Sequence, residues 1–183
     1  MSKAQLLLLF VTLIPIANCC AIRLFEKSEK LVDLVTRIFP ILFTASLIGL
    51  LNVNGLAYLE PLKASQKISF GFSADKNSIT LLFFLNIIWV SFSFYSSKFL
   101  QVHDRDDEDN SDNNLKLFFA LIVSLTTLII ISKNIITTLL FYYGLLFLRH
   151  FYAIKFLYKD KEPPSFFTFI LYLESILFSL AVI

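Results

Sequence analysis

The chain has 183 residues, of which 57% are hydrophobic, and its mean hydropathy is +0.74. A soluble domain of this length does not need so much apolar surface, so the composition predicts an all-α integral membrane protein. The formal net charge is only +2, which excludes a basic footprint for nucleic acid. The two cysteines, Cys19 and Cys20, are adjacent and provide neither a disulfide framework nor a metal cage.

Six apolar segments are predicted to cross a membrane within one domain that covers residues 1–183. A spanning helix needs about 20 mostly apolar residues. The predicted spans are roughly 4–22, 36–59, 79–100, 115–132, 134–154 and 165–183.

The first predicted span follows Lys3, and its apolar run Leu6–Ile16 also fits a signal peptide. We expect an uncleaved helix because five more spans follow. In the second span, Pro40, Gly49 and Gly55 predict a kink or a close helix contact.

The stretch before the third span contains alternating residues and two turn-formers, Gly71 and Asp75. This pattern predicts a short polar hairpin that runs straight into the helix. The next polar stretch, 101–114, is acidic but lacks the glycine and the terminal glutamate of a calcium loop, and nothing supplies a second imidazole beside His103. It predicts a solvated, flexible loop.

The fourth and fifth spans are separated only by Ser132-Lys133-Asn134, which predicts a tight turn at the membrane surface. Lysine and arginine are biased toward alternate connections, which favours an outer N-terminus. The hairpin around Gly71 is then outside, and residues 155–162 are inside. Because Ile183 follows an apolar span with no polar tail, we expect a shortened chain.

Two stretches resemble a known family in sequence order. The first is residues 67–97, where the hairpin enters an apolar helix that ends in Phe-Tyr-Ser-Ser. The second is residues 131–146, which read Ile-Ser-Lys-Asn-Ile-Ile-Thr-Thr-Leu-Leu-Phe-Tyr-Tyr-Gly-Leu-Leu. Both resemble the antiporter-like membrane subunits of respiratory complex I, the subunit 2, 4 and 5 type of NADH–ubiquinone oxidoreductase, and the related subunits of Mrp-type cation/proton antiporters. The resemblance runs from about residue 70 to the end of the chain and implies a partial antiporter-like repeat.

The resemblance also implies which functional positions have changed. The family has a membrane glutamate where this chain has Tyr143, and a lysine where it has Leu171. Tyr143 and Leu171 cannot replace the charged glutamate–lysine pair that exchanges protons in the family. Leucine carries no charge, and the pKa of tyrosine is about 10. We therefore expect a mainly structural, non-catalytic subunit that needs no cofactor and whose own proton channel is lost.

One carboxylate remains deep in a predicted span. Glu174 lies among Phe, Leu and Ile in the sixth segment. It is either a displaced proton relay or a residue that contacts another helix, because intramembrane charges are paired or functional. Arg149 and His150 in the fifth span are its candidate partners, although His150 fits an interfacial anchor better.

The resemblance implies a place in the respiratory chain, in electron transport coupled to proton transport. The composition, rich in Phe, Ile, Asn and Lys, is typical of A+T-rich coding and favours the mitochondrial inner membrane. The expected partners are other membrane-arm subunits, lipid and a separately encoded second half, without nucleic acid. One alternative is a fragment of an Mrp-type antiporter subunit in a bacterial inner membrane. The other is an unrelated structural protein with several spans.

Overall fold

The computed structural model describes residues 2–53, 57–63, 69–103 and 111–152, together with Glu174 and Ile176. The described chain forms five helices and one antiparallel pair of strands: α1 (Lys3–Leu24), α2 (Glu29–Leu51), β1 (Ala57–Lys63), β2 (Ser69–Ala74), α3 (Lys76–His103), α4 (Ser111–Ile131) and α5 (Ile135–Tyr152).

All five helices are long and apolar enough to cross a membrane. The predicted helical architecture is therefore confirmed for the first five spans. The sixth predicted span, 165–183, lies outside the described residues except for Glu174 and Ile176, which are both helical. The polar loop predicted at 101–114 is shorter, because α3 reaches His103 and α4 begins at Ser111; residues 104–110 lie outside the described chain.

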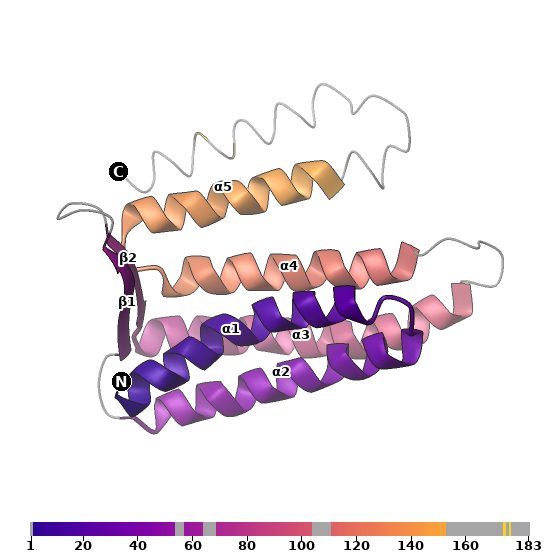
Figure 1. Cartoon of the computed structure of the whole chain (residues 1–183), viewed down its shortest axis with the longest axis horizontal. Helices are drawn as coiled ribbons and strands as arrows, with labels where there is room; N and C mark the ends of the chain where they lie inside the picture. The colour runs from indigo at the N-terminus through magenta and orange to yellow at the C-terminus, as the bar shows by residue number, and fades with distance from the viewer. Residues whose placement is uncertain are drawn as a thin grey trace.

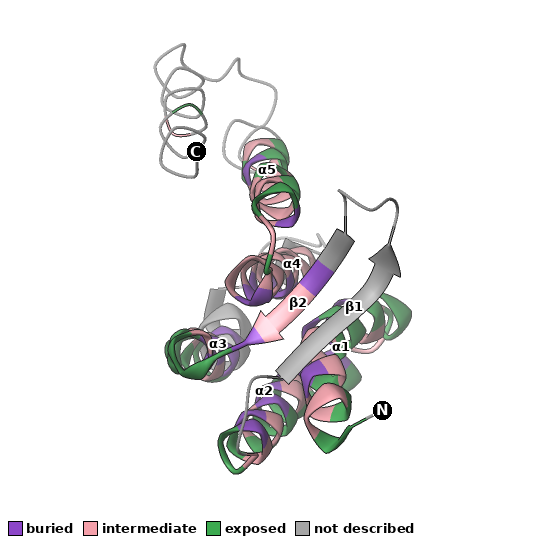
Figure 2. Cartoon of the chain, turned by 90° about the vertical axis from the view of Figure 1, so that its left-hand side faces the viewer, coloured by how far each residue is buried: buried purple, intermediate pink, exposed green. Residues whose placement is uncertain are grey.

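The first four helices form an antiparallel bundle, in which α1 and α3 each pack against both α2 and α4. α5 packs on the far side of α4 (Figure 2). The two strands lie across one end of the bundle, where β1 contacts α1 and β2 contacts α3 and α4 (Figure 1). We name this the hairpin end. The opposite end, where α1 leads into α2 and α4 begins, is named the charged end because Arg23, Glu26, Asp33 and Lys116 lie toward it.

Helical periodicity explains the core of the bundle. In α1 the buried residues are Leu8, Val11, Pro15, Asn18, Cys19 and Ile22, which recur every three or four positions as one face of a helix does. The largest buried side chains are Trp89 and Phe43, whose rings meet edge to face with centroids 5.6 Å apart. Outward positions are apolar too: Phe84 is 62% exposed and Phe147 is 72% exposed. Apolar residues on both the inner and outer faces are typical of a membrane helix.

The structure corrects the boundaries of the second predicted span, 36–59. α2 spans Glu29–Leu51, so it begins and ends about two turns earlier. Its charged first turns are stable because Asp33 pairs with Lys116 of α4, and Glu29 lies where the helix dipole favours a negative charge. Residues 57–63, which begin inside the predicted span, form β1 instead.

The hairpin is present, but Gly71 and Asp75 are not its turn. β1 pairs with β2 from Ala57↔Ala74 to Lys63↔Ser69, with an irregularity between Leu59 and Leu62. Gly71 lies within β2, and its carbonyl accepts a hydrogen bond from the Lys133 backbone N–H at 2.9 Å. Asp75 starts α3: its carboxylate accepts a 2.7 Å hydrogen bond from the Ser78 backbone N–H, as a helix N-cap does.

We expect Asp75→Ala to destabilise the protein by about 1 kcal/mol, the typical loss when an N-cap is removed. The side-chain and backbone hydrogen bonds from Ser78 hold the pKa of Asp75 below its ordinary value of 3.8. A lowered folded-state pKa means that this stabilisation is fully present above the ordinary pKa and is lost as pH falls through the folded pKa. Thermal unfolding in detergent at neutral and at strongly acidic pH measures both effects.

Asp75→Asn is the matched control, because asparagine also caps helices but does not titrate. It should retain most of the stability at neutral pH. A loss as large as that of Asp75→Ala would show that the cap is not the source of the effect.

Candidate functional site

A buried ion pair links two helices across the bundle. The Lys116 Nζ of α4 lies 2.6 Å from the Asp33 Oδ1 of α2, and the two side chains are 6% and 18% exposed. An unpaired charge in this position would carry a large desolvation penalty. The contact between the two charges is therefore what allows both residues to lie within apolar helices.

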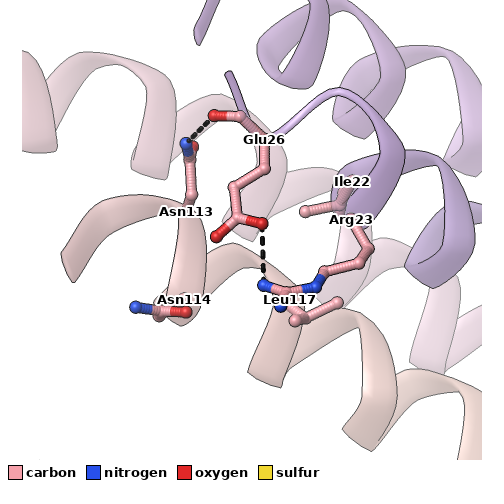
Figure 3. A pocket seen from close by; sticks show the side chains of 6 residues that line it. All are labelled: Ile22, Arg23, Glu26, Asn113, Asn114 and Leu117. Carbon is pink, nitrogen blue, oxygen red and sulfur yellow. Dashed lines mark hydrogen bonds and ion pairs between the residues drawn. The ribbon is translucent and has the colours of Figure 1, made fainter. Parts of the chain in front are cut away.

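A shallow pocket lies at the charged end of the bundle. Six residues from α1, α4 and the turn after α1 line it: Ile22, Arg23, Glu26, Asn113, Asn114 and Leu117 (Figure 3). Arg23 and Glu26 form an ion pair at 2.7 Å, and the Asn113 amide donates to the Glu26 backbone carbonyl at 3.0 Å. Arg23 is largely exposed, whereas Asn113 is buried, so only part of the pocket's polar lining is open to solvent.

Polar contacts continue deeper into the bundle. The Cys19 thiol of α1 lies 3.3 Å from the Ser124 hydroxyl of α4. The Asn86 amide of α3 donates to the Thr44 hydroxyl of α2 at 2.6 Å. These pairs join α1 to α4 and α2 to α3, as polar side chains do between membrane helices.

Some buried polar atoms in the same bundle have no hydrogen-bond partner among the described residues. Asn18 is fully buried, and neither its amide nitrogen nor its oxygen is bonded. The hydroxyl of Thr127 and the side-chain oxygens of Asn86 and Asn113 are likewise unbonded. An unsatisfied buried polar group costs about 1–3 kcal/mol, so these groups weaken the bundle unless water reaches them.

The structure brings together two of the predicted site residues. The Arg149 guanidinium lies 3.0 and 3.2 Å from the two carboxylate oxygens of Glu174. The two side chains are 45% and 37% exposed, so the pair is on the outer surface of α5 and not in the bundle. Tyr142 interacts with the same carboxylate.

The other predicted positions are more scattered. Tyr143, in the family's glutamate position, is 45% exposed on α5. His150 follows Arg149 near the described end of α5 and is partly buried. Leu171 lies outside the described residues. In the part of the chain that the structure describes, no three His, Cys, Asp or Glu side chains are grouped as metal ligands.

Asp33 and Lys116 are not among the site residues predicted from the sequence. The predicted spans leave Asp33 in the connection before residue 36 and put Lys116 at the start of the span 115–132. The available signal was Lys116 itself, a single cation that opens the apolar run Leu115–Ile131. Its partner could not be identified, because Asp33 is 83 residues away in the sequence.

No protein-family model matches this chain, and no curated protein matches it significantly.

We expect Lys116→Met and Asp33→Asn each to lower the free energy of unfolding by about 3 kcal/mol, because either change leaves a buried charge without its partner. The double substitution Lys116→Met with Asp33→Leu should cost less than either single change, since it removes both charges. Unfolding in mixed detergent micelles measures these free energies. Arg23→Gln breaks an exposed pair and is the control, with an expected loss under about 1 kcal/mol. Single changes at 33 and 116 that are as mild as this control would contradict the account.

Proposed function

We propose that this protein is a membrane-arm subunit of a proton-pumping NADH–ubiquinone oxidoreductase, of the antiporter-like type and with a mainly structural role. The proposal extends the sequence resemblance and places the chain in the mitochondrial inner membrane among other membrane-arm subunits. Its five apolar helices and the large apolar side chains on their outer faces fit a protein surrounded by lipid and neighbouring subunits.

The observation that supports the proposal is a contact between the two stretches that resemble the family, residues 67–97 and 131–146. They are separated in sequence by the rest of α3 and by α4, yet Gly71 of the first bonds to Lys133 of the second. Phe72 and Ser132 also form a bridge between the two stretches. A methyl group at Gly71 would lie 3.6–3.8 Å from Lys133 and Asn134. Chance similarity in separate apolar helices gives no reason for these motifs to pack together.

The structural role follows from the changed positions. Tyr143 offers a phenol on an exposed face of α5 where the family has a glutamate. Glu174 interacts with Tyr142, the residue before Tyr143, and its carboxylate is already engaged by Arg149. The arrangement therefore supports a contact between helices better than a group that loads and releases protons.

An Mrp-type cation/proton antiporter subunit in a bacterial inner membrane is the second candidate, because the same two stretches resemble that group. The composition of the purified assembly separates the two. An unrelated structural protein with several spans would form neither assembly.

Gentle detergent extraction followed by native electrophoresis tests the assignment. We expect the chain in a band far larger than its 21.0 kDa monomer, together with flavin and iron–sulfur proteins. Small antiporter subunits in that band would favour the second candidate. A stable monomer absent from any large band would contradict both.

Glu174→Gln tests the role of the half-exposed ion pair. We expect it to reduce the amount of assembled complex while leaving proton pumping per assembled complex unchanged, because a neutral amide weakens the contact with Arg149. Quinone-coupled pumping by vesicles, normalised to assembled complex, measures this. Arg149→Gln should have the same effect, since it removes the other partner. Slower pumping by normally assembled Glu174→Gln complex would instead make Glu174 a proton relay.

A further inference from the structure

The outward side of α2 combines apolar and cationic side chains. α2 lies at the edge of the bundle, and its exposed residues face away from α1 and α3 (Figure 2). Four exposed residues recur on this side every three or four positions: Lys30, Leu34, Arg37 and Ile41. Side chains at this spacing are neighbours along one face of a helix. We name this face the α2 stripe.

Arg37 has no ionic partner in its own helix, although it lies about two turns inside an apolar span. It is exposed, and among the described residues it forms no ion pair and no side-chain hydrogen bond. Asp33, four residues earlier, has the spacing of a helical ion pair, but its carboxylate is bonded to Lys116 within the bundle. The buried pair therefore leaves the charge of Arg37 uncompensated.

Lys30 is in the same situation at the start of the stripe. It is exposed and likewise forms no ion pair within the described chain. Glu26, four residues before it, pairs with Arg23, and Asp33, three residues after it, is already paired within the bundle. Glu29 is the neighbour in sequence, and adjacent residues do not face each other on a helix. The charged end of the stripe therefore carries two uncompensated cations.

The apolar part of the α2 stripe begins beside these charges. Leu34 lies between the two cations and is 54% exposed, and Ile41 follows Arg37 and is 62% exposed. A charge among such residues is costly in hydrocarbon, so a long cationic side chain extends to the nearer membrane surface. Helical side chains also point toward the N-terminus, which for α2 is at the charged end. Both effects direct the Arg37 guanidinium toward Lys30.

We propose that the α2 stripe binds one phospholipid with an anionic headgroup, whose phosphate lies between Lys30 and Arg37 and whose acyl chain lies against Leu34 and Ile41. The two cationic residues are about 10 Å apart along the helix, a distance that two long side chains can close around one phosphate. Charge complementarity favours this occupant, because the headgroup supplies the anion that α2 lacks. The inference shares with the proposed function only the requirement that α2 crosses a membrane.

Titration of the purified, delipidated protein in mixed micelles tests the site, with bound lipid counted by native mass spectrometry. Phosphatidylglycerol is the anionic probe and phosphatidylcholine the zwitterionic one. We expect phosphatidylglycerol to bind at least about 10-fold more tightly, because two basic side chains face its phosphate. The double substitution Lys30→Gln with Arg37→Gln should remove this preference. Equal binding of the two lipids by the unchanged chain would overturn the site.

A matched pair of single variants separates a site from general attraction to a charged surface. Arg37→Gln and Lys27→Gln each remove one exposed cation near the charged end, but Lys27 lies in the turn between α1 and α2 and outside the stripe. We expect Arg37→Gln to weaken phosphatidylglycerol binding about 5-fold and Lys27→Gln to weaken it less than about 2-fold. Arg37→Lys should retain most of the affinity because it keeps the charge. Equal losses from Arg37→Gln and Lys27→Gln would contradict the proposal.

Ile41→Ser distinguishes a lipid from a free anion, because it keeps both charges and removes apolar contact. We expect it to weaken phosphatidylglycerol binding several-fold, and we expect inorganic phosphate at equal concentration not to displace the lipid. Unchanged binding by Ile41→Ser, or displacement by phosphate, would reduce the stripe to an anion site and overturn the lipid proposal.

A photo-crosslinking amino acid at Leu34 extends the test to intact membranes. We expect it to form adducts with lipid, since the proposal places an acyl chain there. Adducts with a polypeptide alone would show that a protein covers the stripe, and would overturn the proposal. None of these outcomes changes the band expected on native electrophoresis, so the lipid site and the assignment to a complex can fail independently.

Discussion

The contact between Lys116 and Asp33 is the constraint on which the arrangement of the bundle depends. Each residue lies within an apolar helix. Either charge alone would carry a large desolvation penalty there. The pair connects α4 to α2 across the bundle. It also stabilises the first turns of α2, which contain Asp33. α1 and α3 each pack on both of these helices, so the pair joins two helices that otherwise meet mainly through α1 and α3.

The hairpin end is organised differently, by backbone hydrogen bonds. β2 is joined to the turn between α4 and α5 through Gly71 and Lys133, while Asp75 starts α3 directly after the strand. The strands therefore connect the start of α3 with the end of α4 and the start of α5. Side-chain charges stabilise one end of the molecule and main-chain hydrogen bonds stabilise the other. A cluster of buried apolar residues lies between these two ends.

Apolar length alone predicted α1, α3, α4 and α5 to within a few residues, because long runs without charge have few alternatives to a helix. It failed at α2, where the start depends on Asp33 finding a partner in a helix that comes much later in the chain. It failed again at β1, because Ala57, Tyr58 and Leu59 continue the apolar run of α2 and show no strand alternation until their pairing with β2 is known. Part of the candidate site is predictable from the sequence. Arg149 and Glu174 are charged residues in apolar segments, and the structure brings them into contact. The unbonded state of Asn18 was not visible, since whether a buried amide has a partner depends on the packing of all four helices.

We propose that the chain works as one subunit among others in a membrane. Phe147 on the outer face of α5 is 72% exposed, and a photo-crosslinking amino acid at this position tests the claim in intact membranes. The account predicts a covalent adduct with a different polypeptide, identified by mass spectrometry. Adducts with lipid alone, from chain that is folded and correctly inserted, would contradict it.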